Sequence, residues 1–374
     1  HASTTTVGIT QMLSRINAMA VQSQLTRVST PVNRDGKATD LRQLHPSHYG
    51  IFCPSATPEG HSCGLIKELS VVCHLRSGFE KELVEQWLAL ADWCVMHTAD
   101  LAGVARLVER PLVFINGDPV ATVREGESPE VLVARARRAR RLMQLPFDLS
   151  IFIENGDVHF GSDAGCLLRP LIIASELPRL RTALAERKHD EPFRVALEEG
   201  IVEFIDKHEE RHCIVALLVD DMYEHDDTAY THLEIHPVGL LGICASLIPH
   251  ADRNQAPRNM YQCSMGKQAI SMGSLAWRQR FDTQMHIPHY VQRPLTQTWF
   301  EQDSGCMECP NGTNVVLGIL SGWHNQEDSL IMNRASVQRG LFHSSLFTSV
   351  RAEEHSCGVD RQLFGHPESE PSCV

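Results

Sequence analysis

The sequence predicts an α+β protein made of several domains. Its 374 residues exceed one ordinary domain, and 43% apolar residues suffice for a core in each of two to four domains. Helical and strand-like segments alternate along the chain without the regular spacing of βαβ units. No apolar run reaches the roughly 18 residues of a membrane span, so no membrane function is expected.

Helical periodicity marks four segments. In residues 8–28 helix breakers are few, and Ile9, Met12, Leu13 and Ile16 recur at helical spacing. The other predicted helices cover residues 80–102, the clearest amphipathic pattern of the chain, a segment that begins at Ser128 through its cap and first-turn proline, and residues 193–199.

Strand signals complete the α+β pattern. Asn-Gly turns predict two β-hairpins, because such pairs readily adopt the positive φ values of a two-residue turn. The hairpins join residues 112–115 to 120–123 and residues 151–154 to 157–160, and three further strand-like segments are residues 201–206, 213–219 and 315–320.

Charge and cysteine content limit the function classes. Lys and Arg number 34 against 46 Asp and Glu, and the net charge of −12 argues against a protein that coats DNA non-specifically. It remains compatible with nucleic acid in one cleft. Twelve irregularly spaced cysteines indicate reduced thiols and an intracellular protein. The start at His1, without a signal pattern, indicates an internal piece of a longer polypeptide.

Three collinear motifs carry a resemblance to a known family. The first is the stretch 248–268, with its order of Pro, Asp, Asn, Arg, Tyr, Lys and Gln. The second is residues 44–50 with Thr-Pro-Glu-Gly at 57–60, and the third is residues 325–333. Together they resemble the second-largest subunit of multisubunit DNA-dependent RNA polymerases. The style is nearer to eukaryotic, archaeal and large DNA virus enzymes than to bacterial ones.

The resemblance implies four regions. A fork region is expected at residues 1–78, two small external α/β domains at 79–170 and 171–230, and the N-terminal part of a β-rich hybrid-binding domain at 231–374. It also implies an enzyme, active only in complex with the largest subunit, that transfers ribonucleoside monophosphates from NTPs to an RNA 3′ end as a DNA template directs.

The same resemblance implies partners and a compartment. The expected partners are the largest subunit, the other polymerase subunits, the DNA template, the nascent RNA and NTPs. The expected place is intracellular: the nucleus, or the cytoplasm or a virus factory for a viral enzyme.

The first motif holds the candidate substrate-binding residues. Arg258 can clamp phosphate oxygens with two parallel hydrogen bonds, and Lys267 and Gln268 follow about three turns later on a helix that begins near it. By resemblance, Arg258 reaches the phosphates of the incoming nucleotide, and Tyr261 and Gln268 lie near the RNA 3′ end, with Lys267 grouped beside them. An ordinary ion pair for the arginine and core packing for the tyrosine are the structural alternatives.

The third motif holds the acidic pair Glu327 and Asp328. Because it follows the strand-like residues 315–320, both carboxylates are expected to project at a strand end. By resemblance, the pair contributes to catalysis at the second, exchangeable Mg²⁺ that enters with the nucleotide, mainly through Asp328. The principal Mg²⁺ ligands belong to the largest subunit. A solvated acidic turn is the alternative.

The upstream region resembles the fork. Arg27, Arg42 and His45 are candidates for lining the path of nucleic acid, although each could equally be structural. Two departures from the family pattern stand out: Ala56 occupies a position where the family typically has Glu, and residues 323–324 replace a single aromatic residue.

Two patterns suggest a zinc site and a nucleic-acid-binding surface, but the residues around them do not favour either. Cys306 and Cys309 have zinc-ligand spacing, but no second pair accompanies them, so free thiols and no zinc are expected. Five arginines between residues 135 and 141 form the densest basic patch. Their spacing distributes them around a helix, which favours a solvated or partner-facing surface over nucleic-acid contact.

A second class of function stays open: a non-catalytic paralogue, derived from a polymerase, that serves as an assembly or nucleic-acid-binding module. A longer reading frame with downstream basic residues, together with a partner gene carrying metal-binding aspartates, would favour the enzyme. A stop soon after Val374 would favour the module.

Overall fold

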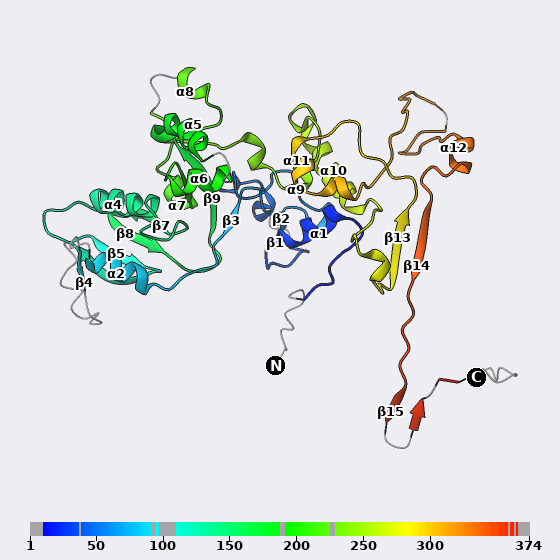
Figure 1. The fold of residues 1–374 in the computed structure, drawn as a ribbon, viewed down its shortest axis with the longest axis horizontal. Coiled ribbons are helices and arrows are strands. Elements are labelled where there is room, and N and C mark those ends of the chain that lie inside the picture. The colour runs from blue at the N-terminus through cyan, green and yellow to red at the C-terminus, as the bar shows by residue number, and fades with distance from the viewer. Residues whose placement is uncertain are drawn as a thin grey trace. The chain divides into compact units, whose positions relative to one another are not determined.

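The computed structural model describes most of the chain as two compact units, Leu25–Met265 and His1–Gln24 with Gly266–Val374 (Figure 1). The described residues are 10–36, 39–90, 94–96, 110–187, 191–224, 229–322, 324–357, 360–362 and 364–365.

The first sheet of the unit Leu25–Met265 has five strands in the order β4-β6-β5-β8-β7. Both of its hairpins turn at an Asn-Gly pair whose four φ values lie between 52° and 91°, as the turn between two right-twisted strands requires. Both predicted hairpins are confirmed. The strands are β4 (Cys94–Met96), β5 (Leu112–Ile115), β6 (Asp118–Val123), β7 (Ser150–Glu154) and β8 (Asp157–Gly161).

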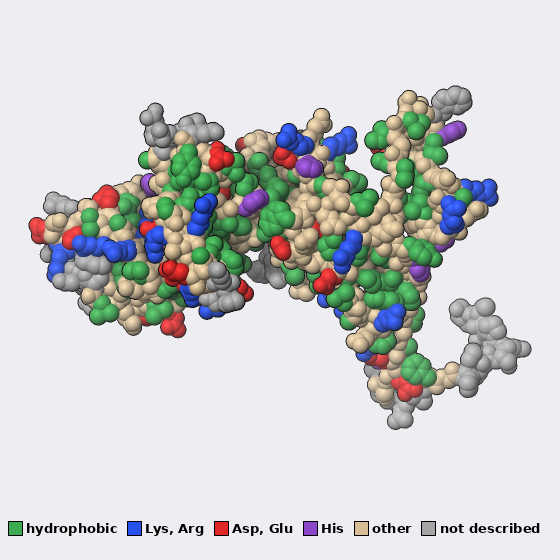
Figure 2. All heavy atoms as spheres, turned by 45° about the horizontal axis from the view of Figure 1, so that its top comes forward, with side chains coloured by type: hydrophobic (Ala, Val, Ile, Leu, Met, Phe, Trp, Pro, Cys, Tyr) green, Lys and Arg blue, Asp and Glu red, His purple; other side chains and the backbone are tan. Residues whose placement is uncertain are grey.

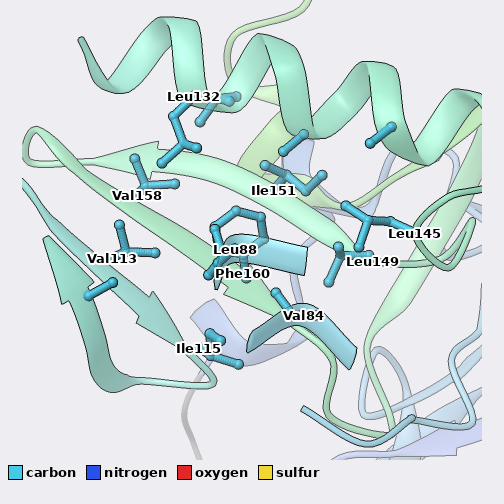
Figure 3. Close-up of a cluster of buried hydrophobic side chains, with 14 of the residues drawn as sticks. Val84, Leu88, Val113, Ile115, Leu132, Leu145, Leu149, Ile151, Val158 and Phe160 are labelled. Carbon is cyan, nitrogen blue, oxygen red and sulfur yellow. The ribbon is translucent and has the colours of Figure 1, made fainter. Parts of the chain in front are cut away.

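One face of this sheet packs against α2 (Glu82–Leu90) and α4 (Pro129–Arg141). Alternate strand residues such as Val113, Ile151 and Phe160 point to that face and are almost fully buried, as Figure 3 shows. Each such side chain contributes roughly 1.5–3 kcal/mol to stability. The helix predicted to begin at Ser128 is confirmed as α4, with Pro129 in its first turn, although the Ser128 side chain makes no capping hydrogen bond.

The second sheet of this unit has the order β10-β9-β12-β11, with β3 also paired to β9. Its core includes Ile172, Ile201 and Leu233, and the helices α5 and α6 contribute side chains to the same cluster. The elements are β3 (His74–Leu75), β9 (Leu167–Ile173), α5 (Leu177–Glu186), α6 (Pro192–Glu198), β10 (Val202–Ile205), β11 (Val215–Ala216) and β12 (His232–Leu233), with η4 (Ala174–Glu176), α7 (Lys207–Glu210) and α8 (Asp221–Glu224) between them.

Loops and short helices form the rest of this unit. The strands β1 and β2 pair antiparallel, with Arg27 opposite Glu68. The elements are β1 (Arg27–Ser29), η1 (Asp40–Arg42), η2 (Pro46–His48), η3 (Gly60–Ser62), β2 (Ile66–Glu68), η5 (Pro237–Leu240), α9 (Ile243–Ser246), η6 (Ala251–Arg253) and α10 (Ala256–Gln268), whose last three residues belong to the other unit.

The second unit is smaller and exposes a larger share of its apolar side chains. Figure 2 shows green side chains on the visible face around β13, β14 and α12. Its strands pair as two antiparallel ribbons, β13 with β14 and β15 with β16. The elements are α1 (Ala18–Leu25, which ends one residue into the other unit), η7 (Trp277–Gln279), β13 (Gln284–Pro288), α11 (Trp299–Asp303), η8 (Cys306–Glu308), α12 (Arg334–Gln338), β14 (Ser344–Thr348), β15 (His355–Cys357) and β16 (Asp360–Gln362).

Helical periodicity overestimated the length of two helices. Residues 10–16 are not helical, because Asn17 starts α1 by accepting a hydrogen bond from the backbone N–H of Ala20; Ile9 lies outside the described residues. The helix predicted over 80–102 is confirmed only as α2, since residues 94–96 pair with β6 instead. Residues 91–93 and 97–102 lie outside the described residues.

Two strand predictions also need correction. Residues 315–320 form no strand and are largely exposed, because no neighbouring segment among the described residues offers them a ladder of hydrogen bonds. The strand predicted over 213–219 shortens to β11. The strand over 201–206 and the helix over 193–199 are confirmed within one residue at each end. The α+β class therefore holds, while the four-domain division remains a prediction.

The arginines of α4 correct the expectation of a solvated basic surface. Arg140 is fully buried and donates to both carboxylate oxygens of Glu209, at 2.7 and 3.0 Å, and to Glu203 at 3.0 Å. Arg141 also pairs with Glu203, at 2.7 Å, and Arg137 lies 3.3 Å from Glu209. These arginines tie the first sheet's helix to α7 and β10, so most of the patch serves internal ion pairs.

His232 on β12 joins the same network. Its Nε2 lies 2.9 Å from Glu203 Oε1. Burial alone would lower the pKa of His232, but hydrogen bonds to Cys213 and Glu203 outweigh it and raise the pKa to about 9. The imidazolium form is therefore the one that the fold stabilises.

A second buried network surrounds Arg169 on β9. Its guanidinium pairs with Glu210, at 2.8 Å, and with Glu234, and stacks 5.2 Å from the ring centroid of Tyr49. Gly50 is needed beside it, since its φ is +69° and a Cβ there would lie 2.7 Å from the arginine side chain. The network thus joins the loop around residue 50 to the second sheet.

Candidate functional site

Helix α10 carries four of the predicted site residues, Arg258, Tyr261, Lys267 and Gln268. A proline at position 257 suits the first turn, where a backbone N–H has no helical partner. The buried positions 259, 263 and 266 recur at helical spacing and fix the inward face, which leaves the outward face to the site residues.

Arg258 is an exposed cation near the start of α10. Its guanidinium lies over the ring of Tyr261, 5.5 Å from the centroid, and Tyr261 is itself 38% exposed. Within the ranges that the structure describes, no acidic side chain pairs with Arg258. The ion-pair alternative for the arginine and the core-packing alternative for the tyrosine therefore find no support here.

Asn259 orders the turn that precedes Arg258. It is buried, its Nδ2 donates to the carbonyl of Ala251 at 2.8 Å, and its Oδ1 accepts from Asn254 at 3.2 Å. His250 enters this turn with a φ of +52°, a conformation that non-glycine residues adopt only when their surroundings impose it. The start of α10 is thus anchored by side-chain hydrogen bonds.

Lys267 and Gln268 lie in the last turn of α10. Position 268 shares the helical face of positions 258, 261 and 265, all exposed. Lys267 is half-buried and lies about half a turn around the helix from position 258. The helix therefore aligns Gln268 with Arg258 and Tyr261, and directs Lys267 elsewhere.

The acidic pair lies in an exposed turn with an unusual backbone. Glu327 and Asp328 have φ values of +55° and +63°, two successive left-handed non-glycine residues. Ser329 closes the turn by donating from its hydroxyl to the carbonyls of His324 and Gln326, each at 2.8 Å. Left-handed residues cost on the order of 1–2 kcal/mol each, and such strain is concentrated at functional sites.

The turn does not follow a strand, as the sequence suggested, because residues 315–320 are irregular. Arg258 belongs to one compact unit and Glu327 and Asp328 to the other. The expected meeting of the guanidinium and the carboxylates at one cavity therefore stays a prediction.

The three upstream candidates differ in their surroundings. Arg27 is exposed on β1. Arg42 donates from its guanidinium to the carbonyls of Arg34, His61 and Cys63 at 2.7–3.0 Å, which ties three loops together and favours its structural alternative. His45 is exposed and starts η2, where its Nδ1 accepts from the N–H of Ser47 at 3.2 Å.

The cysteine pair and the two departures from the family pattern complete the set of sequence features. Cys306 and Cys309 are free thiols around η8, and burial raises the pKa of both. Over the described part of the chain, no three His, Cys, Asp or Glu side chains are grouped to hold a metal ion. Ala56 is almost fully buried. Trp323 lies outside the described residues, and the helices that are described include none with the length and apolar content of a membrane span.

Sequence reasoning missed the two buried ion-pair networks. A signal existed in the run His232-Leu-Glu-Ile235, where polar and apolar residues alternate from the start of β12. Its His232 and Glu234 are the residues that reach Glu203 and Arg169. Alternation predicts a half-exposed strand, however, and only the packed structure shows that both faces are covered.

Comparison with known proteins identifies the family. Three family models match: RNA polymerase Rpb2, domain 3 at residues 11–75; Rpb2, domain 4 at residues 113–175; and Rpb2, domain 6 at residues 244–373. The chain is 33% identical to DNA-directed RNA polymerase II subunit 2 of Arabidopsis thaliana, over 98% of this chain and 32% of that protein.

Further relatives give the same result. Identity is 35% to DNA-directed RNA polymerase II subunit RPB2 of Encephalitozoon cuniculi, over 94% of this chain and 31% of that protein. Identity is 34% to DNA-directed RNA polymerase subunit Rpo2 of Saccharolobus shibatae, over 93% of this chain and 31% of that protein. The chain thus spans about a third of the length of the curated relatives it matches.

The chain is a segment of a large subunit of the multisubunit RNA polymerases. Within that class it belongs to the Rpb2 type, the second-largest subunit. The resemblance read from the three motifs is confirmed.

Proposed function

We propose that this chain forms part of the nucleotide-addition site of a DNA-directed RNA polymerase, active together with the largest subunit. The observation that carries the proposal is Arg258: an exposed guanidinium without an acidic partner in the described structure, stacked on Tyr261 and anchored through Asn259. The relatives compared with this chain are named as polymerase subunits, which supports this function over a non-catalytic module.

Arg258 binds the triphosphate of the incoming NTP in this proposal. A guanidinium presents paired N–H groups that match two phosphate oxygens and remains charged at any physiological pH. As charge shifts between phosphate oxygens during transfer, a preorganised donor lowers the barrier. Tyr261 restricts the guanidinium by stacking, so less conformational entropy is lost when the nucleotide binds.

Glu327 and Asp328 hold the second Mg²⁺ in the proposal, with Asp328 as the main ligand. Proteins bind Mg²⁺ through one or two carboxylates together with substrate phosphates, and two adjacent exposed carboxylates fit that donor set. When bound, the ion neutralises charge on the phosphates. The tightly held Mg²⁺ remains with the largest subunit.

The other candidates contact nucleic acid. Gln268 and Tyr261 lie near the RNA 3′ end, Lys267 binds substrate from another face of the same helix, and Arg27 and His45 line the path of DNA and hybrid. Arg42 orders that region through its three carbonyl contacts. These contacts with nucleic acid form only in the assembled polymerase.

The regions divide as the resemblance implies: a fork at 1–78, external domains at 79–170 and 171–230, and a hybrid-binding domain from 231. The other polymerase subunits, the DNA template, nascent RNA and NTPs are the partners. The compartment is intracellular, either nuclear or, for a viral enzyme, the cytoplasm or a virus factory.

The test replaces Arg258 in the reconstituted polymerase. Arg258→Ala is expected to slow nucleotide addition by about 10²-fold, the scale of losing one transition-state donor. Arg258→Lys keeps the charge but loses the paired geometry, so an intermediate loss is expected.

Arg278 offers a matched control, since it is also an exposed arginine stacked on its neighbour's ring, Trp277, at 5.3 Å. Arg278→Ala should leave the addition rate within about twofold, the range of an uninvolved surface change. Equal rates for Arg258→Ala and Arg278→Ala would remove Arg258 from the site and favour the non-catalytic module.

A further inference from the structure

A buried side chain, that of Asn17, binds the last turn of α10. Asn17 is 1% exposed, and its Nδ2 donates to the carbonyl of Gly266 at 2.8 Å and to that of Ala269 at 2.6 Å. All three residues lie in the same compact unit. These two carbonyls come directly before and directly after Lys267 and Gln268, so Asn17 fixes the backbone on both sides of that pair.

The other end of the same amide starts a second helix. Asn17 Oδ1 accepts a hydrogen bond from the N–H of Ala20 at 2.6 Å, in the first turn of α1. One planar amide therefore accepts from the N–H of Ala20, which has no helical partner in α1, and donates to two carbonyls at the end of α10. A carboxylate cannot replace it because it has no donor, and a hydroxyl cannot because it has only one.

The chain around Asn17 approaches the segment after α10 so closely that glycine is required at position 273. A Cβ on Gly273 would lie 1.9 Å from the backbone carbonyl oxygen of Arg15, whereas a Cβ on Gly266 would lie 2.9 Å from the sulfur of Met19, a flexible side chain that can shift. The N–H of Ser271 also donates to the carbonyl of Ile16 at 3.2 Å. Residues 15–19 thus form a tight strap along the segment that follows Gln268.

We infer that Asn17 is a positioning residue for nucleotide addition, acting through the backbone of Lys267 and Gln268. It touches no substrate itself. This inference rests on the proposed function, because it assumes that Gln268 lies at the RNA 3′ end and that Lys267, its neighbour in the chain, binds substrate. Displacement of a catalytic contact by about 1 Å can cost on the order of 10²-fold in rate, which makes such an anchor measurable.

The test is Asn17→Asp in the reconstituted polymerase. Aspartate has the same shape and still accepts from Ala20, yet it offers no donor and places a negative charge beside the carbonyls of Gly266 and Ala269. The expected result is at least a roughly tenfold lower rate per active elongation complex. The fraction of complexes that extend RNA should be unchanged, whereas a merely structural loss would lower that fraction instead.

Two further variants separate the loss of the Asn17 donors from the effects of added charge and of a general change in α1. Asn17→Ser keeps a helix-starting hydroxyl and removes the amide donors without adding charge, so a smaller loss of the same kind is expected even if the aspartate variant fails to assemble. Gln22→Glu makes the same amide-to-carboxylate change in α1, where the Gln22 amide donates to the carbonyl of Ser304 at 2.9 Å. It should keep its rate within about twofold.

A double-mutant cycle separates the two proposals. In a Lys267→Ala, Gln268→Ala background, Asn17→Asp should add little further loss, because the groups it positions are gone. Fully additive losses, or a rate for Asn17→Asp equal to that of Gln22→Glu, would overturn the role of Asn17. If the Lys267→Ala, Gln268→Ala background itself elongates normally, the proposed function of that pair fails independently of Asn17.

Discussion

Removing the Arg140 guanidinium should destabilise the unit Leu25–Met265 by about 3 kcal/mol. Arg140→Met keeps a similar volume but leaves the buried carboxylates of Glu203 and Glu209 without their shared cation. Breaking a buried pair from one side costs roughly 3–5 kcal/mol. The lower end applies here, because Arg141 still lies 2.7 Å from Glu203 and Arg137 still lies 3.3 Å from Glu209.

Urea unfolding of the 374-residue chain, followed by circular dichroism, would measure this loss, with hydrogen exchange at β7 and β10 reporting where it occurs. Arg138 is an exposed arginine of the same helix. Arg138→Met is therefore the matched control and should stay within about 0.5 kcal/mol.

A second variant tests the cause of the loss. Arg140→Met with Glu209→Gln removes the stranded charge while keeping an acceptor for the N–H of Ile151, which Glu209 binds at 2.9 Å. It should recover about 1 kcal/mol or more. The reasoning is refuted if Arg140→Met matches the Arg138→Met control, or if the double variant is less stable than Arg140→Met alone.

Three other outcomes are expected. Because the pKa of His232 is raised from 6.5 to about 9 in the folded chain, the stability that the imidazolium contributes should be complete below pH 6.5 and lost as pH rises to about 9, by at most about 3 kcal/mol. Urea unfolding at several pH values would measure this loss. A His232→Gln chain whose stability falls equally with pH would contradict it. Metal analysis of the purified chain should find no stoichiometric zinc at Cys306 and Cys309, since burial raises the pKa of both thiols and disfavours the thiolate that binds zinc; one zinc per chain would overturn this. Asp328→Asn in the reconstituted polymerase should raise the Mg²⁺ concentration for half-maximal rate by roughly tenfold, because the amide keeps the shape of the ligand and loses its charge; an unchanged Mg²⁺ titration would exclude Asp328 as a ligand.

Local chemistry explains what could be predicted well. The two Asn-Gly turns and the start of α4 after Ser128 depend on the φ preferences of a few adjacent residues, Pro129 among them, which are the same in any surroundings. The order of residues in the three motifs likewise identified the family, and it placed Arg258 and Tyr261 near the start of a helix that does form there.

Competition between distant segments decided the rest. Residues 94–96 continue a helical pattern, yet they pair with β6, because a neighbouring strand supplies hydrogen bonds that periodicity does not describe. Residues 315–320 have the composition of a strand and form none, since a strand needs a partner as well as a propensity.

The sequence by itself determined the family, the α+β class, the hairpins and the identity of the candidate site residues, since these depend on residue type and order along the chain. Only the tertiary structure decided that Arg140 is an internal ion-pair partner rather than a surface charge, and that Asn17 braces the turn holding Lys267 and Gln268. The physical reason is that burial and hydrogen-bond partners are set by residues about 60 to 250 positions away, whose approach no local pattern encodes.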